Sequence, residues 1–310
     1  MTINKILADH KKDYVDSLVI PTIKERRQYL FDLLNCLTSQ IVKPREIVIV
    51  CDEKLTIPLE TLMKYEKLGI KLTFIVASPE LTLGATRNLG IKGTNSKYIY
   101  FLDDDTLPSK NWLAEMRKSL EQGVDIVGGV SEPLFKPGIK KPIWWDTVLL
   151  GPYVAVGNQY LKFAYDGIWG CNFAIRNDVI NKIGYFDEKL GMRRSYPKLL
   201  SEDSEFVNRA ARSGLTVQFN SNATVYHRLN AERINLANFR KRAWQEGQTI
   251  KEVNKNRKSY RNFAFFKVIL FKAFRGPYFV LLRKSKAVTL PIHMLLLIYE
   301  IMGWLGIGHQ

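Results

Sequence analysis

The sequence predicts an α/β fold, with a mostly parallel sheet flanked by helices and a helical, basic extension at the C-terminus. Three observations lead to this prediction. Short runs of Val, Ile, Leu, Phe and Tyr recur through the first half of the chain, stretches with helical spacing separate them, and basic residues gather after residue 232. Alternating strands and helices are typical of a parallel sheet covered on both faces.

The composition is that of a folded globular protein. The 310 residues are 46% hydrophobic and 25% charged, which excludes disordered and fibrous classes. The three cysteines, Cys36, Cys51 and Cys171, are too few and too far apart for a disulfide framework or a zinc site. No basic segment followed by an apolar run opens the chain, so we expect no secretory signal and a reducing, cytoplasmic setting.

Five apolar runs in the first half are predicted as strands covered on both faces. They are residues 17–22, 46–52, 72–77, 98–104 and 125–130. Helical spacing over 29–37 and 112–120 predicts helices between them. Ligands of such sheets bind beyond the carboxyl ends of the strands, so functional residues are expected there.

The second half of the chain is less regular. Residues 131–168 contain four prolines and the pair Trp144-Trp145 without a clean period, which predicts a long ordered loop of functional importance. Order returns at 169–175. Further elements are expected as a helix at about 203–213, a strand at about 216–227 and a polar helix at about 235–258.

Three consecutive aspartates, Asp103, Asp104 and Asp105, follow the fourth apolar run. In an extended chain Asp103 and Asp105 would point to the same side. Two carboxylates this close repel unless a cation lies between them, and their oxygens suit Mg²⁺ or Mn²⁺. A solvated acidic turn is the alternative interpretation.

Four further residues are candidates for function. Arg87 stands in a glycine-rich helix start, where arginine and the helix terminus both favour anions, although a surface arginine would give the same pattern. Glu202 and Asp203 fit the first turn of a helix, where acids also occur as capping residues. His227 ends an apolar strand as a candidate metal ligand, although a lone histidine is more often structural.

Together these motifs resemble the family 2 glycosyltransferases, enzymes with the GT-A fold that use nucleotide-sugar donors. The resemblance spans about residues 15–230. The motifs that carry it are Val19-Ile20-Pro21-Thr22 in the first strand, Arg87-Asn88, the Asp103–Asp105 triplet as the Asp-x-Asp motif, 169–174 with 184–187 on the acceptor side, Glu202-Asp203 with Arg209, and His227. The resemblance implies a GT-A catalytic domain over 1–232, divided into a nucleotide-sugar half (about 15–130) and an acceptor half (131–232), with 233–310 as the extension.

The resemblance also implies roles for individual residues. Asp203 would be the general base, and Glu202 would orient the base or the acceptor. Asp105, with Asp103 and His227, would hold Mn²⁺ or Mg²⁺. The expected donor-binding residues are Pro21, Thr22, Asp52, Arg87, Asp103 and Asp104, and the expected acceptor contacts are Trp144, Trp145, Trp169 and Asn172. The three tryptophans could equally fill the core.

The expected reaction is inverting transfer of a sugar from a nucleoside diphosphate to an acceptor hydroxyl. UDP is the expected nucleotide, because it is the commonest one in the family that the chain resembles. The acceptor would be a glycan or a lipid-linked oligosaccharide in surface polysaccharide assembly. The chemistry agrees with these roles, because a divalent cation stabilises a departing diphosphate and one carboxylate activates the hydroxyl. A nucleotidyltransferase is the first alternative, but residues 23–27 lack the glycines of its phosphate loop.

The formal net charge is +16, and residues 233–286 hold 15 Lys or Arg against two acids. No nucleic-acid motif accompanies the charge, so we expect no nucleic-acid partner. Lys267, Lys272 and Arg275 share one helical face in an aromatic-rich segment that Gly276-Pro277 is expected to interrupt. Such a basic face opposite an aromatic one is typical of a helix in a membrane interface.

The last apolar stretch, residues 292–305, is short for a membrane span and contains Glu300. We therefore expect peripheral contact with the inner face of the cytoplasmic membrane rather than a crossing. Packing of these helices on the catalytic domain, or on a second copy of the chain as a homo-oligomer, remains the alternative.

Overall fold

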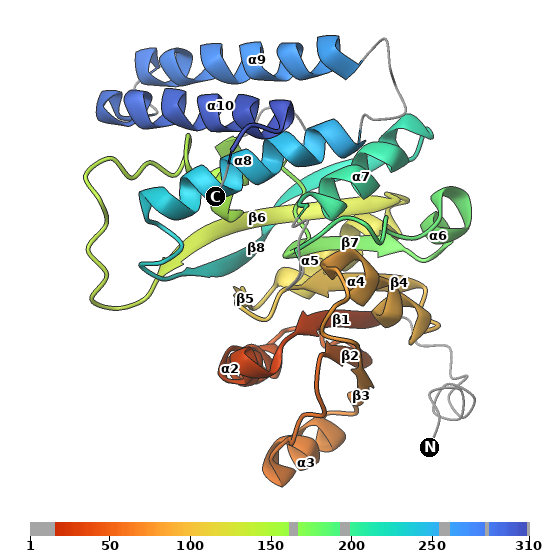
Figure 1. Cartoon of the computed structure of the whole chain (residues 1–310). Coiled ribbons are helices and arrows are strands. Elements are labelled where there is room, and N and C mark those ends of the chain that lie inside the picture. The colour runs from red at the N-terminus through yellow and green to blue at the C-terminus, as the bar shows by residue number, and fades with distance from the viewer. Residues whose placement is uncertain (1–15, 161–166, 193–198, 254–260, 283–284, 309–310) are drawn as a thin grey trace.

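The computed structural model describes residues 16–160, 167–192, 199–253, 261–282 and 285–308. In these residues, one mixed eight-stranded sheet runs in the order β3-β2-β1-β4-β7-β6-β8-β5 (Figure 1). The strands are β1 (Asp16–Thr22), β2 (Glu46–Cys51), β3 (Lys71–Val76), β4 (Tyr98–Leu102), β5 (Thr106–Pro108), β6 (Ile126–Phe135), β7 (Asn172–Arg176) and β8 (Val217–Leu229). The α/β prediction is thus confirmed.

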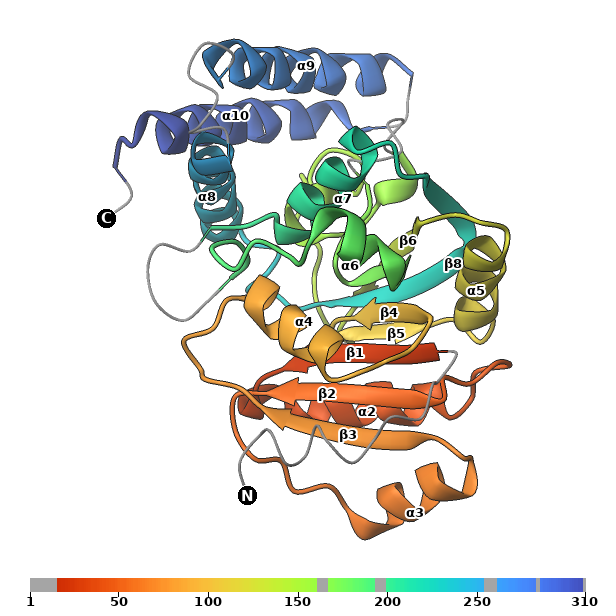
Figure 2. The same ribbon diagram turned by 90° about the vertical axis from the view of Figure 1, so that its right-hand side faces the viewer.

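Helices cover both faces of the sheet and form a further layer at the C-terminal end (Figure 2). The α-helices are α2 (Arg27–Leu37), α3 (Leu59–Lys67), α4 (Leu83–Lys92), α5 (Trp112–Glu121), α6 (Asp178–Ile183), α7 (Glu202–Arg212), α8 (Leu236–Val253), α9 (Arg261–Leu281) and α10 (Leu290–Leu305). Short 3₁₀ helices are η1 (Lys24–Arg26), η2 (Gly151–Val154), η3 (Asn158–Tyr160) and η4 (Ala287–Thr289).

The first half of the sheet is parallel. β1 lies between β2 and β4, and β2 pairs with β3. Alternate side chains of these strands enter two cores: Leu18 and Ile20 face α2, α3 and α5, whereas Val19 faces α4, α6 and α7. β3 departs from the prediction, because as an edge strand it is only partly buried.

The second half adds antiparallel strands. β7 pairs antiparallel with β4 and β6, and β5 pairs antiparallel with β8, whereas β6 and β8 are parallel. The predicted strand 98–104 ends at Leu102, and β5 was not predicted because three residues carry no period. The predicted loop 131–168 begins as strand, since β6 continues to Phe135 along β8. Part of that loop, 161–166, lies outside the described residues.

The C-terminal helices pack on the rest of the molecule. α8 crosses α10 where Gly247 and Gly303 face the partner helix, and a Cβ on either glycine would collide with a backbone carbonyl oxygen. A third core joins Phe239, Leu296 and Phe279 to the segment around Trp145. Within the chain, these helices therefore pack on the part of the molecule that precedes them, as the alternative interpretation expected.

Two expectations about the extension are wrong. α9 continues through Gly276-Pro277, since a proline removes only one helix hydrogen bond and α9 is supported by its packing on α10. Lys272 and Arg275 do not form a free basic face. Lys272 pairs with the buried Glu300, and Arg275 donates to the carbonyl of Val148.

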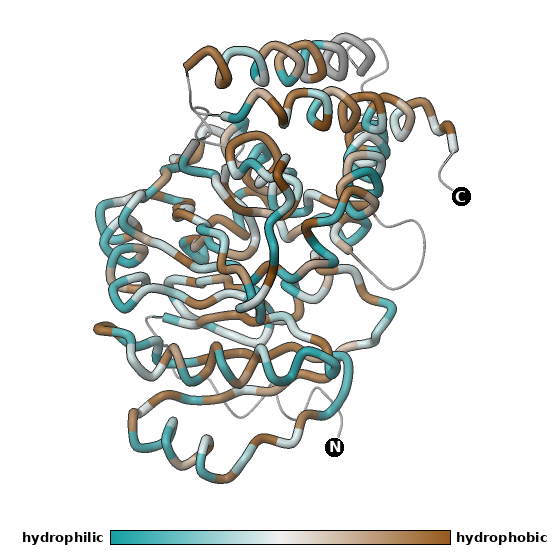
Figure 3. Tube along the Cα trace, turned by 90° about the vertical axis from the view of Figure 1, so that its left-hand side faces the viewer, coloured by the Kyte–Doolittle hydropathy of each residue, from teal (hydrophilic) through white to brown (hydrophobic). Residues whose placement is uncertain are grey.

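The last apolar stretch is longer than the sequence suggested. In the described residues, Ala287–Leu305 is a helical stretch of 19 residues with a mean hydropathy of 1.6. By length and composition alone, this stretch could cross a membrane. Only a third of that stretch is buried, and apolar residues run along both α9 and α10 (Figure 3). Glu300 within this stretch is 0% exposed and accepts hydrogen bonds from Tyr153 and Lys272.

Candidate functional site

The carboxyl ends of β1, β2 and β4 meet at one edge of the sheet. Thr22, the last residue of β1, donates a 2.7 Å hydrogen bond from its hydroxyl to Oδ2 of Asp104. The backbone N–H of Lys24 donates to Oδ1 of Asp52 across 2.9 Å. The parallel strand order thus brings together Thr22, Asp52 and the aspartate triplet, as the strand-end rule predicts.

The aspartate triplet is a turn rather than an extended segment. The backbone N–H and hydroxyl of Thr106 both donate to the carbonyl of Asp103 and close the turn. The side chains therefore do not alternate as expected. Asp103 meets Arg87, whereas Asp105 meets His227 and Arg233. Asp104 lies between them in the sequence, and burial and the charge of Asp105 raise the pKa of its carboxyl to about 7.

Asp105 and His227 form a pair that fits a divalent cation. β5 pairs with β8 so that Thr106 lies opposite His227, which brings Nε2 of His227 to 3.1 Å from Oδ1 of Asp105. Nδ1 of His227 lies 3.1 Å from the carbonyl of Ala155, which can only accept, so Nδ1 donates to this oxygen. Oδ1 of Asp105 is buried and has no hydrogen-bond donor. A carboxylate oxygen and an imidazole nitrogen, both suitable ligands for a divalent cation, thus lie side by side, with Nη1 of Arg233 at 3.0 Å from Nε2.

Two arginines that the sequence did not single out neutralise these carboxylates. Nη1 of Arg233 lies 2.6 Å from Oδ2 of Asp105 and 3.0 Å from Nε2 of His227. Nη1 of Arg26 lies 3.1 Å from Asp104 and 3.3 Å from Asp105. Although burial opposes ionisation, His227 and the two arginines hold the pKa of Asp105 well below its usual range. Among the described residues, no group of three or more His, Cys, Asp or Glu forms a complete metal cage.

Arg87 joins the two halves of the site. It lies on α4, whose first turn is capped by the hydroxyl of Thr82. Its buried guanidinium binds Glu202 through Nη1 and Asp103 through Nη2, the latter at 2.9 Å. A Cβ at position 170 would collide with this guanidinium, which requires Gly170. The structure thus places Arg87 between carboxylates.

The Glu202-Asp203 pair begins α7. Ser201 before it adopts a left-handed conformation with φ of 65°, which turns the chain into the helix. Asp203 accepts hydrogen bonds from the backbone N–H of Gly170 at 2.6 Å and from that of Ser204 at 2.7 Å. Burial and the charge of Asp203 raise the pKa of Glu202 to about 7, and Arg87 opposes this shift.

The residues expected to contact the acceptor divide into two groups. Trp169 is buried and lies next to Gly170, which bonds Asp203. Asn172 instead accepts a hydrogen bond from Nε1 of Trp112 and donates to the carbonyls of Val130 and Ala223. Trp144 and Trp145 pack on Phe239 of α8. Asn172, Trp144 and Trp145 thus have partners within the fold.

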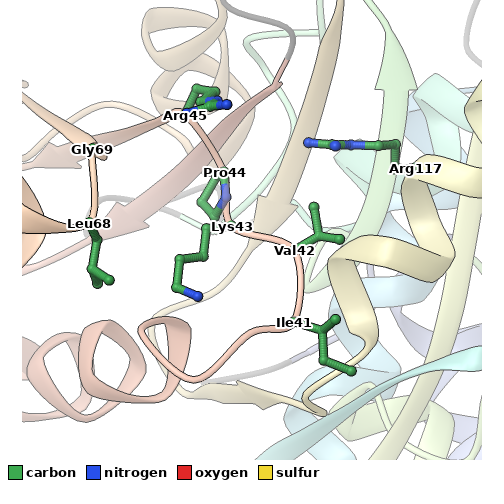
Figure 4. A pocket seen from close by; sticks show the side chains of 8 residues that line it. All are labelled: Ile41, Val42, Lys43, Pro44, Arg45, Leu68, Gly69 and Arg117. Atoms are coloured by element: carbon green, nitrogen blue, oxygen red, sulfur yellow. The ribbon is translucent and has the colours of Figure 1, made fainter.

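A basic pocket of about 350 Å³ lies at the other end of the parallel strands (Figure 4). Lys43 and Arg45 line it from the segment before β2, and Gly69 lines it from the segment before β3. Arg117 on α5 completes the wall and pairs with Asp16. The pocket is therefore separate from the carboxylate site.

Several site residues have no sequence signal. Arg26 and Arg233 are basic residues among many, and only the fold brings them to the triplet. Gly170 belongs to the 169–174 motif, but its bond to Asp203 uses a backbone N–H, which every residue except proline carries, so the motif does not reveal this contact. The unusual backbone conformation of Ser201 also has no signal in the sequence.

The family model described as Glycosyl transferase family 2 matches residues 17–184 of the chain. The succinoglycan biosynthesis protein ExoM of Rhizobium meliloti (strain 1021) is 26% identical over 176 residues, which make up 56% of this chain and 53% of ExoM. An uncharacterized glycosyltransferase of Methanocaldococcus jannaschii is 29% identical over 111 residues, 36% of this chain and 38% of that protein. The chain therefore spans about half, or less, of the length of these curated relatives.

A solved structure shares the fold over nearly the whole chain. It is the mannosyltransferase PcManGT from Pyrobaculum calidifontis in complex with GDP-Man and Mn²⁺, with a TM-score of 0.59. The superposition covers 97% of this chain and 92% of that chain at 13% identity. The expected GT-A fold is thereby confirmed.

Proposed function

The chain belongs to glycosyl transferase family 2, and we propose that it is an inverting enzyme that moves a sugar from a UDP-linked donor to an acceptor hydroxyl. The acceptor class we propose is a glycan or lipid-linked oligosaccharide in surface polysaccharide assembly. The similarity to a succinoglycan biosynthesis protein supports this class. We further propose that residues 1–232 are the catalytic unit and that 233–310 form an extension.

One observation carries the proposal. Arg87 bonds Asp103 of the aspartate turn and Glu202 of the catalytic helix at the same time. The donor-side carboxylates and the Glu202-Asp203 pair are therefore parts of one site, although about 100 residues separate them in the sequence. A surface acidic turn and a helix cap would not require this bridge.

In the proposed reaction, Asp203 is the general base. Its two oxygens accept hydrogen bonds from Gly170 and Ser204, which fix the carboxylate plane. It takes the proton from the acceptor hydroxyl while that oxygen bonds to the anomeric carbon. The bond from this carbon to the diphosphate breaks on the opposite face of the sugar, so the configuration inverts and the nucleoside diphosphate leaves.

The donor lies, in this proposal, along the carboxyl ends of β1, β2 and β4. Pro21, Thr22 and Asp52 would border the nucleoside, and Asp103 and Asp104 would border the ribose and diphosphate. Asp105 and His227 would hold Mn²⁺ or Mg²⁺, with Asp103 turned to Arg87. The bound ion supplies positive charge to the departing diphosphate. PcManGT, which shares the fold, was solved with GDP-Man and Mn²⁺, which supports a nucleotide sugar and a divalent cation as the ligands.

The experiment is a donor screen. The purified protein is incubated with UDP-sugars and GDP-sugars and Mn²⁺, and the released phosphates are identified. We expect nucleoside diphosphate from a UDP-sugar. In a parallel assay with a nucleoside triphosphate and a sugar 1-phosphate, pyrophosphate release would instead identify a nucleotidyltransferase. A GDP-sugar as the active donor in the screen would overturn the UDP assignment alone.

We also propose that the extension contacts the membrane peripherally through aromatic and apolar side chains of α9. Phe274 is 69% and Leu281 is 81% exposed, and Phe271 and Tyr278 are exposed beside them. Lys267 on α9 and Lys286 after the end of α9 are exposed as well. An aromatic face with basic residues at its margins fits an anionic bilayer interface. The buried ion pair of Lys272 with Glu300 keeps the opposite face of α9 on the protein.

A further inference from the structure

Ser201, the residue before the Glu202-Asp203 pair, does not act as an ordinary helix cap. A serine at this position usually accepts a hydrogen bond from a backbone N–H of the first helical turn, but within the described part of the chain its side chain caps no N–H of α7. The hydroxyl of Ser201 instead donates to Oε2 of Glu246 on α8 across 3.1 Å. The carbonyl of Ser201 accepts the first hydrogen bond of α7, from the N–H of Glu205. The residue that begins α7 is thus attached to the extension.

A second hydrogen bond joins the same segment to α8. The backbone N–H of Leu200, a buried residue, donates to Oγ1 of Thr249 across 2.8 Å. The hydroxyl of Thr249 donates its own hydrogen to the carbonyl of Gln245 one turn earlier, also at 2.8 Å, which leaves a lone pair for Leu200. Thr249 is 2% exposed, so water does not replace it as the acceptor. The buried N–H of Leu200 therefore depends on a side chain of α8.

The backbone of Ser201 needs such support. Its φ of 65° lies in the left-handed region, which residues other than glycine adopt at an energetic cost and keep where surrounding contacts hold them. α8 is itself fixed against α10, because Gly247 on α8 lets the two helices approach so closely that a Cβ there would collide with the carbonyl oxygen of Glu300. The two bonds from α8 thus join the turn before α7 to a helix that is held on its other side.

We propose that Thr249 and Glu246 are positioning residues for Asp203, and that they act through the turn that leads into α7. The proposal rests on the proposed function, in which Asp203 is the general base. A base must lie within hydrogen-bond distance of the hydroxyl that it deprotonates, and a displacement of about 1 Å can lower the rate about 100-fold. Since α8 holds the residues from which α7 begins, it sets the place of the carboxylate on the first turn of α7. The extension thus takes part in the geometry of the reaction.

The test is Thr249→Val, which keeps the shape of the side chain and removes the acceptor. Release of UDP from the UDP-sugars of the donor screen is measured with water as the acceptor. We expect kcat to fall about tenfold or more and the KM of the donor to stay unchanged, since a displaced base affects the chemical step. Thr249→Ser keeps the hydroxyl and should retain the wild-type kcat. Thr289→Val, the matched control, removes another buried hydroxyl of the extension, which bonds the carbonyl of Trp144, and should also retain it.

Two further variants separate positioning from a loss of stability. Added to Asp203→Asn, Thr249→Val should lower kcat no further, because the base through which it acts is already absent. Ser201→Ala, which removes the bond to Glu246, should lower kcat with an unchanged KM. The proposal is overturned by a wild-type kcat in Thr249→Val and Ser201→Ala, by an equal loss in Thr289→Val, or by additive losses in the double variant.

Hydrogen exchange tests the same contact without sugar transfer. Backbone amides of residues 200–205 should exchange faster in Thr249→Val than in Thr289→Val, because the N–H of Leu200 loses its acceptor. Equal exchange in the two variants overturns the proposal. If no donor is turned over, the proposed function fails, whereas this comparison still decides whether α8 holds the turn.

Discussion

The backbone N–H of Gly170 donates a 2.6 Å hydrogen bond to Oδ2 of Asp203, 33 positions later. The same glycine leaves room for the guanidinium that binds Glu202. One residue without a side chain therefore contributes to the position of both Glu202 and Asp203.

Asp203→Asn should lower turnover about 10²–10⁴-fold, the usual contribution of a general base. Gly170 donates to one oxygen of Asp203 and Ser204 donates to the other. Because an amide has only one acceptor oxygen, the asparagine cannot accept both bonds in this way. Donor affinity should not change, because the proposed donor site lies at the aspartate turn. Nucleoside diphosphate release and calorimetry with the donor measure the two effects. Glu205→Gln in the same helix turn is the control, and wild-type turnover of Asp203→Asn would remove the assignment.

Arg87→Met should lower the free energy of unfolding by about 3–5 kcal/mol, because it leaves two buried or half-buried carboxylates without their cation. Urea denaturation measures this loss. Arg176→Ala, which breaks a half-exposed pair with Asp178, should cost no more than about 1 kcal/mol. Equal losses in the two variants would show that the ion pairs of Arg87 with Asp103 and Glu202 do not stabilise the site more than a surface pair does.

Protonation of Glu202 should make stability depend on pH. Its pKa is raised from 4.5 to about 7 in the folded protein, chiefly by burial. The folded state therefore binds the proton more tightly, and this contribution is full below about pH 4.5 and lost as pH rises through about 7. Between pH 7.5 and pH 5.5 the melting temperature should rise in the wild-type protein and rise less in Glu202→Gln. Parallel profiles would contradict the shift.

Metal removal should abolish transfer, and Mn²⁺ or Mg²⁺ should restore it. Asp105→Asn and His227→Gln should each weaken Mn²⁺ binding by more than the roughly 10–100-fold typical of residues that only orient ligands. Paramagnetic resonance of free Mn²⁺ measures the affinity without catalysis. Asp178→Asn, on α6, serves as the control. Full activity in EDTA would rule out the metal role of the Asp105–His227 pair.

Phe274→Glu should reduce sedimentation with vesicles that contain anionic lipid by about tenfold or more, because a phenyl side chain contributes about 1.5–3 kcal/mol on burial. Ile143→Glu changes an equally exposed apolar residue outside the extension and should have no effect. Sedimentation velocity without lipid identifies the alternative occupant of this face, a second copy of the chain. A dimer that Phe274→Glu dissociates, with no vesicle binding in the wild-type protein, would replace the membrane proposal.

Much of the fold could be predicted from local patterns. The apolar runs of β1, β2 and β4 and the spacing of α2 and α5 follow from burial on regular elements, which needs no knowledge of distant residues. β5 and the continuation of β6 could not be predicted, because their formation depends on pairing with β8. Helix α9 passes through Pro277 for the same reason, since packing on α10 outweighs a local preference.

The sequence by itself determined the residue types of the site and their order: a carboxylate triplet at a strand end, an arginine at a helix start, an acidic pair and a histidine. The tertiary structure decided their partners. It turned Arg87 toward Asp103 and Glu202, brought Arg233 to Asp105, and placed Asn172 and Trp145 in the core. Composition and spacing indicate which chemistry a side chain is capable of. Charge pairing and burial depend instead on distances across the folded chain, which local sequence does not encode.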